Sequence, residues 1–165
     1  MEGEHLAAVC GLYCGACSLY RARRDNDPQQ LEELLQTLSE RWQVPSDELD
    51  CDGCLAQGHL TPYCQECKMR LCAADKPGVT RCSDCPDFPC SLVTDFNNDG
   101  VRHHAEVLEN VRHQREIGID EWLQEEYERW RCQFCGVSLE WYARTCYRCR
   151  TPQPRRLPSL PQDEE

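Results

Sequence analysis

The sequence has little of the material from which an ordinary protein core is built. It contains three phenylalanines and two methionines, and it has no apolar run long enough to span a membrane. Hydrophobic residues make up 40% of the chain, but the 15 cysteines among 165 residues supply about nine of those percentage points. The length allows one or two small domains, whose cores bury little apolar surface. We therefore expect the cysteines to stabilise the fold where burial of aliphatic side chains alone would not be sufficient.

The sequence also lacks the features of a secreted protein. Its first residues, Met1 to Leu6, include no basic start, and no apolar segment of signal-peptide length follows them. Disulfides persist in oxidising compartments, and an odd number of cysteines does not pair completely within one chain. We therefore expect a cytoplasmic protein with reduced thiols, in which cysteines of this density bind metal.

No motif of a known catalytic machinery is present. There is no Gly-rich phosphate loop, no Ser-His-Asp arrangement and no pair of catalytic carboxylates. His103, His104 and His113 have no carboxylate cluster around them, which favours packing or surface roles. We expect a protein without enzymatic activity and assign no catalytic residue.

What the sequence has in abundance is regularly spaced cysteine. The clearest spacing is the last: two C-x-x-C pairs separated by ten residues, as in a zinc ribbon. Four thiolates at the corners of a tetrahedron close a metal site, so the pattern predicts a structural zinc ion, with a rubredoxin-type iron site as the alternative. The predicted ligands are Cys132, Cys135, Cys146 and Cys149.

The other eleven cysteines fall within residues 10–90, and their grouping is a hypothesis. One partition gives two sites of four cysteines and a third site of three, whose missing ligand could come from His5, His59 or solvent. Interleaved groups fit the sequence equally well. In chain order, the three sets are Cys10, Cys14 and Cys17; Cys51, Cys54, Cys64 and Cys67; and Cys72, Cys82, Cys85 and Cys90.

The metal of these eleven cysteines stays open between zinc and iron–sulfur clusters, because thiolates suit both. The Cys85-Pro86 step is similar to the cysteine-proline step of ferredoxins, so one alternative function is an iron–sulfur electron-transfer or redox protein. A second alternative is a metal-dependent enzyme or metal carrier that uses the incomplete Cys10 group, since catalytic metal sites keep an open position. The three-cysteine pattern of radical enzymes that use S-adenosylmethionine does not apply, because no barrel could follow it here.

Charge is distributed unevenly along the chain. The net charge is −11, which opposes general affinity for nucleic acid, but residues 129–156 contain seven arginines and one acid. Arginines among aromatic residues are typical of a single-strand or RNA contact surface, but solvated arginines or docking on the chain's own acidic body explain them equally well. We expect a protein partner, contact with nucleic acid only through the basic ribbon, and no membrane association.

The remaining patterns predict a small, metal-stabilised α+β protein. Asp27 and Pro28 indicate the start of a helix, and the apolar residues that follow lie on one stripe. Gly118 indicates the end of a later helix, and Asp120 the cap of the next. The expected organisation is a cysteine-rich domain with irregular metal knuckles over residues 1–95, a helical connector over 96–130, a zinc ribbon over 131–150 and a disordered, proline-rich tail over 151–165.

The ordered cysteine series resembles one family. The run from Cys10-Gly-Leu-Tyr-Cys14 to Cys85-Pro-Asp-Phe-Pro-Cys90 looks like the bacterial and archaeal family called domain of unknown function 3795, and residues 102–150 resemble its C-terminal extension. The resemblance implies a prokaryotic, cytosolic, metal-binding protein. It does not indicate which reaction, if any, such a protein catalyses. Lys76-Pro77-Gly78 departs from the expected Lys-Gly, which lengthens a loop without affecting the cysteines.

Overall fold

The computed structural model describes residues 3–25 and 28–160, and this part of the chain is mostly helical. The expected β-structure is confined, in these residues, to three isolated antiparallel bridges. The α-helices are α1 (Ser18–Asp25), α2 (Pro28–Trp42), α3 (Pro62–Gln65), α4 (Lys68–Ala74), α5 (Ser91–Asn97), α6 (Val107–Ile117) and α7 (Ile119–Arg129). Short 3₁₀ helices cover Glu4–Leu6 (η1), Cys14–Ala16 (η2), Ser46–Glu48 (η3) and Arg102–His104 (η4).

The helix predicted after residue 27 is present. Helix α2 begins at Pro28, as the fixed φ of proline favours, and it ends before Gln43, whose φ of 56° is left-handed. Leu35 and Leu38 pack against a small cluster that contains Leu49, so part of the predicted apolar stripe does face the protein. The proposed cap, Asp27, lies outside the described residues.

The connector contains the two predicted helices, with one difference at their junction. Helix α6 ends at Gly118, where a φ of 86° suits a residue without a side chain. Helix α7 then starts at Ile119, so Asp120 lies in its first turn and does not cap it. There its carboxylate still interacts favourably with the positive end of the helix dipole.

The main hydrophobic core joins all the expected segments. Its buried residues include Val9 and Met69 from the cysteine-rich region, Trp122 from α7, and Trp141 from between the last two cysteine pairs. Leu157, in the region expected to be a disordered tail, is 5% exposed and belongs to the same core. The main core thus includes residues from both sides of the boundaries expected near residues 95 and 130, and a separate small cluster lies around Leu139.

Residues 151–160 differ from the expectation of disorder for a physical reason. Pro152 forms a bridge with Thr145, and the backbone N–H of Gln153 donates to the carbonyl of Arg144 at 2.9 Å. The side chains of Gln153 and Leu157 are buried. Proline is compatible with an extended edge segment, because its missing backbone N–H is not needed there as a hydrogen-bond donor. The prolines therefore do not prevent this segment from packing.

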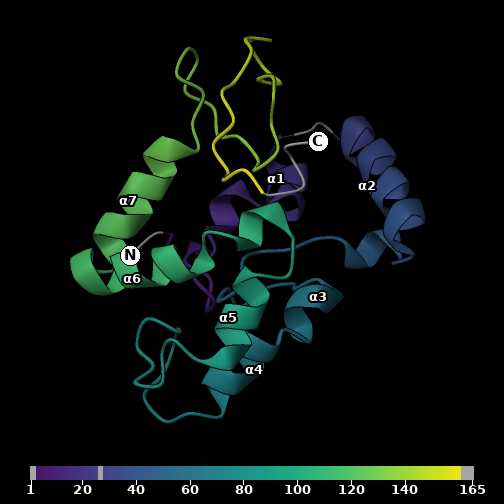
Figure 1. The fold of residues 1–165 in the computed structure, drawn as a ribbon. Coiled ribbons are helices and arrows are strands. Elements are labelled where there is room, and N and C mark those ends of the chain that lie inside the picture. The colour runs from purple at the N-terminus through teal and green to yellow at the C-terminus, as the bar shows by residue number, and fades with distance from the viewer. Residues whose placement is uncertain (1–2, 26–27, 161–165) are drawn as a thin grey trace.

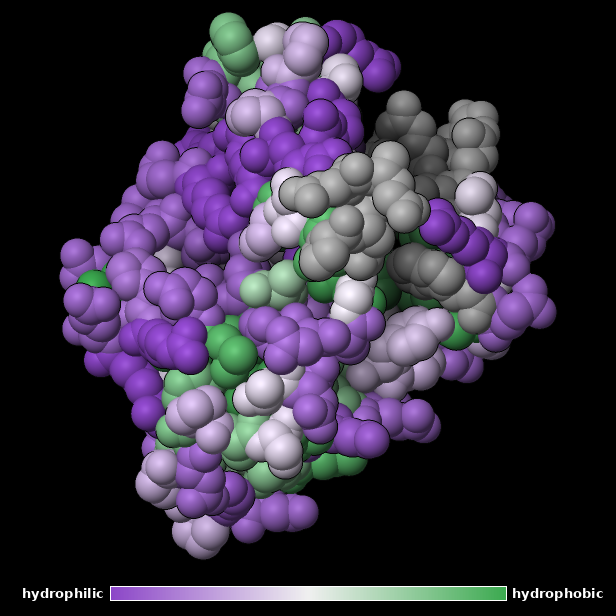
Figure 2. All heavy atoms as spheres, viewed as in Figure 1, coloured by the Kyte–Doolittle hydropathy of each residue, from purple (hydrophilic) through white to green (hydrophobic). Residues whose placement is uncertain are grey.

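Figure 1 shows α6 and α7 on one side of the molecule and α2 on the other, with α1 between them. Helices α4 and α5 and the loop between them form one end, and the loops of residues 131–157 form the opposite end. The face seen in Figure 2 is mainly hydrophilic, with hydrophobic residues visible in its lower half, over the region of α4 and α5. Within the described residues, no helix has the length and apolar character needed to cross a membrane.

Candidate metal centre

The four cysteines after α7 meet at one point, which we call the C-terminal cysteine cluster (Cys132, Cys135, Cys146 and Cys149). Their sulfur atoms all lie within 4.8 Å of one another. The Sγ–Sγ distances are 3.6 Å between Cys132 and Cys149 and 3.5 Å between Cys135 and Cys146. Zinc–sulfur bonds of about 2.3 Å in a tetrahedron place the sulfurs about 3.8 Å apart, so this cluster has the size of a mononuclear site.

Two turns of matching geometry bring these sulfurs together. In each turn, the residue after the second cysteine has a left-handed φ: 72° at Gly136 and 61° at Arg150. That residue's N–H donates to the carbonyl of the first cysteine, at 2.9 Å from Gly136 to Cys132 and 3.0 Å from Arg150 to Cys146. The chain therefore reverses twice in the same way, and each reversal points two thiols to the same side.

The turns also repeat their flanking contacts at a spacing of 14 residues, the separation of Cys132 from Cys146. Leu139 N–H donates to the Trp130 carbonyl at 2.8 Å, and Gln153 N–H donates to the Arg144 carbonyl at 2.9 Å. Bridges join residues 131 to 138 and 145 to 152. This internal repeat explains why residues 151–153, which the sequence analysis assigned to a tail, complete the second turn.

Hydrogen bonding and burial shift the pKa values of Cys132, Cys135 and Cys149 in different directions. The hydroxyl and backbone N–H of Thr151 lower the pKa of the Cys149 thiol to about 6. Burial opposes ionisation of Cys132, but backbone N–H groups outweigh it and lower the pKa of that thiol as well. Although the N–H of Val137 favours its thiolate, burial and the neighbouring thiols raise the pKa of Cys135 to about 11. A divalent cation between the sulfurs would offset the repulsion that keeps Cys135 protonated.

One contact of the cluster was not predicted from the sequence. The side-chain amide of Gln153 is buried and donates from Nε2 to the Cys132 sulfur at 3.4 Å. Such donors orient a thiolate and spread its charge, as outer contacts of metal sites generally do. The 14-residue repeat is the signal that could have identified this residue, since Gln153 occupies the position that Leu139 holds in the first turn.

The eleven N-terminal cysteines are arranged differently from the C-terminal cysteine cluster. Within the described residues, no three of them bring their sulfurs as close together as that cluster does. All eleven carry free thiols. Seven of them belong to the main core or pack against it. Any metal that they share is held by more widely spaced ligands.

Four of these cysteines line one hollow, which we call the cysteine-lined cavity (Cys72, Cys82, Cys85 and Cys90). Its empty space, including its open mouth, is about 380 Å³, and its other walls are mainly apolar residues of α4, α5 and the loop between them. Burial, followed by the neighbouring thiols of Cys90, Cys85 and Cys72, raises the pKa of the Cys82 thiol to about 12. This grouping agrees with one set of the sequence-based partition.

A lysine lies at the mouth of the cavity. Lys76 Nζ is 3.4 Å from the Cys85 sulfur and 2.6 Å from the carboxylate of Asp87. The hydrogen bond to Asp87 and then the one to Cys85 raise the pKa of Lys76 further above its usual value. A permanent positive charge therefore lies against one thiol of the cavity, a contact that the sequence pattern does not predict.

The other seven cysteines are divided between two hydrophobic clusters. Cys51 and Cys64 hydrogen-bond to each other, and Cys17 packs against the same small cluster. Cys54, however, turns to the main core, where its N–H donates to the Cys14 sulfur at 3.4 Å. The two members of the Cys51-x-x-Cys54 pair thus pack in different hydrophobic clusters, as do Cys64 and Cys67, while Cys17 contacts both clusters.

Burial and mutual repulsion dominate the ionisation of the group in the main core. Burial, and then the thiols of Cys54 and Cys67, raise the pKa of Cys10 well above its usual value. The same two causes, burial and neighbouring thiols, act on Cys14, whose nearest such neighbour is Cys54. Cys10, Cys14, Cys54 and Cys67 thus influence one another, and Cys17 and Cys51 are also among the neighbours of this group.

Four of the histidines pack against aromatic rings or interact with acidic residues. His103 stacks on Trp141 with ring centroids 4.1 Å apart, and burial lowers the pKa of His103 to about 3. His104 stacks on Phe96 at 3.8 Å, and His113 Nε2 is 2.6 Å from the Glu125 carboxylate. His59 is exposed on the surface, where its backbone N–H donates to Asp52. These contacts agree with the packing and surface roles expected for His103, His104 and His113.

Comparison with known proteins gives one match. Residues 6–95 match the model of a family described as a protein of unknown function (DUF3795), which confirms the resemblance carried by the N-terminal cysteine series. This segment is more than half of the chain, contains all eleven N-terminal cysteines and ends before the C-terminal cysteine cluster. No curated protein and no solved structure matches the chain.

Proposed function

This chain belongs to the DUF3795 family, and we propose that it is a zinc-binding protein whose C-terminal cysteine cluster holds one structural zinc ion. The observation that carries this proposal is the spacing of the four sulfurs, at 3.5 and 3.6 Å between opposing cysteines. That spacing suits a single ion with short bonds to sulfur. Four protein ligands would leave no coordination position for a substrate, which favours a structural role over a catalytic one.

The small size of the local core explains why such an ion would matter. The hydrophobic cluster around the turns has only Cys132, Leu139 and Cys146 as buried members. The burial of so little apolar surface contributes little folding free energy. In small zinc-binding domains, metal binding supplies most of the folding free energy. We infer that zinc holds the two turns in the zinc-ribbon form predicted from the sequence.

We further propose that the ribbon acts by binding a partner protein. Phe134, at the tip of the first turn, is 73% exposed, and Tyr147, in the second turn, is 43% exposed. Aromatic side chains are enriched in the buried centres of protein interfaces, and their exposure is costly unless they are covered at least part of the time. The zinc ion would keep the two aromatic side chains at a fixed separation.

Metal analysis of the full chain tests the zinc assignment. The double variant Cys135→Ser/Cys149→Ser should lose one equivalent of zinc relative to the wild type. The control is Phe134→Ala, which changes an exposed residue of the same turn and should retain the full content. Equal zinc content in the double variant and the wild type, or iron in place of zinc in the wild type, would overturn the assignment.

A second candidate function, iron–sulfur binding, is favoured by the cysteine-lined cavity. A cluster of four irons presents a separate iron to each thiolate, so its ligands stand farther apart than four ligands of one ion. Cys72, Cys82, Cys85 and Cys90 surround a shared hollow without the close spacing of the C-terminal cysteine cluster. Mainly apolar walls and the Lys76 ammonium near Cys85 are features that tune the potential of such clusters.

Anaerobic purification distinguishes this candidate from zinc. The wild type should contain iron and acid-labile sulfide in equal amounts, with broad absorption near about 400 nm. Cys85→Ser should lose these signals and keep the zinc of the C-terminal cysteine cluster, which also shows that the variant is folded. A colourless protein with zinc in both regions would exclude iron–sulfur clusters and leave the zinc proposal intact.

A further inference from the structure

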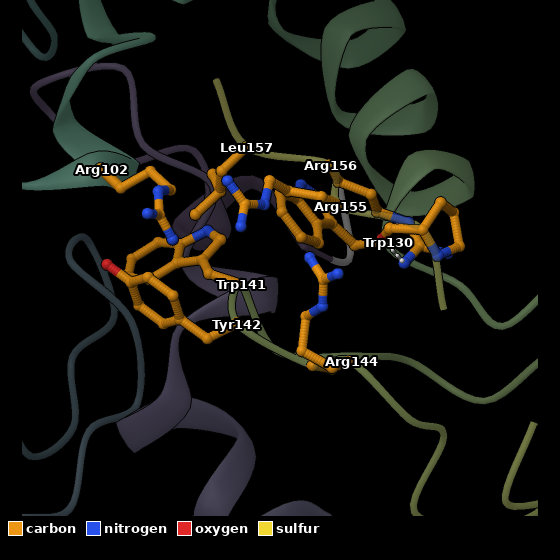
Figure 3. A pocket seen from close by; sticks show the side chains of 10 residues that line it. Arg102, Trp130, Trp141, Tyr142, Arg144, Arg155, Arg156 and Leu157 are labelled. Atoms are coloured by element: carbon orange, nitrogen blue, oxygen red, sulfur yellow. Dashed lines mark hydrogen bonds between the residues drawn. The ribbon is translucent and has the colours of Figure 1, made fainter. Parts of the chain in front are cut away.

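A second hollow lies where the C-terminal residues meet the rest of the protein. Its walls come from η4, from the end of α7, from the loop between the two cysteine turns and from residues 154–157. Figure 3 shows the side chains of Arg102, Arg144 and Arg155 around this hollow, together with those of Trp130 and Trp141. We call this hollow the arginine pocket (Arg102, Trp141, Arg144, Arg155 and Arg156).

The arginine pocket is strongly positive in a chain that is otherwise acidic. Four of its ten lining residues are arginines, and none is aspartate or glutamate. The net charge of the whole chain is −11. A local concentration of positive charge between low-dielectric aromatic walls focuses the field, and it attracts an anion to this position rather than to the surface in general.

Arg156 is fixed in place by the backbone. Its side chain donates to the carbonyl oxygens of Arg129 at 2.8 Å and Arg131 at 3.1 Å. Burial lowers the pKa of its guanidinium, Cys132 opposes this shift, and the nearby Arg129 adds to it. The neutral carbonyl groups orient this charge but do not neutralise it. An anion in the pocket would therefore reduce the free-energy cost of burying the guanidinium.

Trp141 adds a buried donor that the protein does not use. The residue is only 9% exposed, and its indole Nε1 is buried with no hydrogen-bond partner among the described residues. The ring is held rigidly, because it stacks on His103 and its backbone N–H donates to the Ala16 carbonyl at 2.9 Å. A buried donor without a partner costs free energy unless a ligand supplies an acceptor.

We propose that the arginine pocket binds the phosphate group of a phosphate-bearing ligand. A tetrahedral oxyanion offers several acceptors, which suits the planar forks of guanidinium groups and the single indole N–H. The hollow has an open mouth, and Tyr142 and Trp130 line it beside the arginines. The rest of the ligand would extend past these aromatic rings toward solvent.

The phosphate could belong to a free small molecule, such as a mononucleotide, or to the backbone of a single-stranded nucleic acid. Both present the same group to the pocket. The difference lies in how many phosphates contribute, because a nucleic acid would engage other arginines and show a steeper dependence on salt. The two sources therefore separate in a binding experiment.

The test uses the full, zinc-loaded chain and calorimetric titration with inorganic phosphate, adenosine monophosphate and a short single-stranded oligonucleotide. Arg144→Gln removes an exposed charge of the arginine pocket and should weaken phosphate binding roughly tenfold, the loss of one charge-assisted hydrogen bond. Arg148→Gln is the matched control, since Arg148 is an exposed arginine of the second cysteine turn outside the pocket. It should change phosphate binding less than about twofold.

Trp141→Phe gives a second readout, because it keeps an aromatic ring and removes the indole N–H. It should also weaken phosphate binding, while near-ultraviolet circular dichroism reports whether the fold is kept. The proposal is overturned if phosphate shows no saturable binding, or if Arg148→Gln weakens it as much as Arg144→Gln. Tighter, more salt-sensitive binding of the oligonucleotide than of the monophosphate would identify a nucleic acid as the source, and equal binding would identify a small molecule.

Discussion

Replacing Arg129 with methionine should destabilise the protein by about 3 kcal/mol at neutral pH, because it leaves two buried carboxylates without their cation. Arg129 Nη2 lies 2.7 Å from Glu106, and its Nη1 lies 3.0 Å from Glu126. The carboxylate side chains are only 10% and 7% exposed. Arg129 itself is 31% exposed, which places the expected cost at the lower end of the range for breaking a buried ion pair.

The same variant should change how stability depends on pH. Burial raises the pKa of Glu106 above its usual 4.5, and Arg129 opposes that rise. A carboxyl whose pKa is higher in the folded state stabilises the protein most below its unfolded pKa, and that contribution is lost as the pH rises through the folded pKa. Without Arg129 the folded pKa rises further, so the loss extends toward neutrality and the cost of the substitution shrinks as the pH falls toward about 5.

Urea unfolding at several pH values, with zinc held constant, measures both effects. The control is Arg112→Met, which removes an exposed ion pair to Glu109 and should cost less than about 0.5 kcal/mol at every pH. A loss below about 1 kcal/mol for Arg129→Met at pH 7, or a loss that does not change with pH, would refute the argument that these carboxylates depend on Arg129.

Other predictions concern the two cysteine turns. Arg150→Gly should stabilise the zinc-loaded protein by up to about 1 kcal/mol, because a non-glycine residue at a φ of 61° is strained; a destabilised variant in thermal unfolding would contradict this. Gly136→Ala should destabilise it by about the same amount and slow zinc uptake, as a competition with a chromophoric chelator would measure. Leu139→Ala should cost about 2 to 5 kcal/mol, with hydrogen exchange at residues 130–153 rising first; unchanged exchange there would show that this side chain does not hold the turns together.

Local sequence patterns predict those structural features that depend only on residues close together in the chain. The spacing of Cys132, Cys135, Cys146 and Cys149 is enough to bring the four sulfurs together, because each pair sits in its own tight turn. The start of α2 at Pro28 and the end of α6 at Gly118 depend equally on single-residue backbone preferences. In each case the determining interaction is formed within one turn of chain.

The N-terminal cysteines show where this approach fails. Grouping Cys51 with Cys54 assumes that two cysteines in one C-x-x-C pair face the same metal. In the structure, Cys51 hydrogen-bonds to Cys64 in one hydrophobic cluster, whereas Cys54 lies in the main core, where its backbone N–H donates to the Cys14 sulfur. Long-range packing decides which cluster each thiol joins, and spacing does not contain that information.

Gln153 connects the two C-terminal sites in a way that affects how each is measured. Its amide nitrogen donates to the Cys132 sulfur, and its amide oxygen accepts from Arg156 of the arginine pocket at 3.1 Å. A zinc ion that fixes Cys132 would therefore also fix the orientation of Gln153, and through it the guanidinium of Arg156, a lining residue of the arginine pocket. If both proposals hold, zinc loading and phosphate binding are linked, and by reciprocity phosphate should strengthen zinc retention. Weak phosphate binding by incompletely loaded protein would then report the state of the metal centre rather than the properties of the arginine pocket.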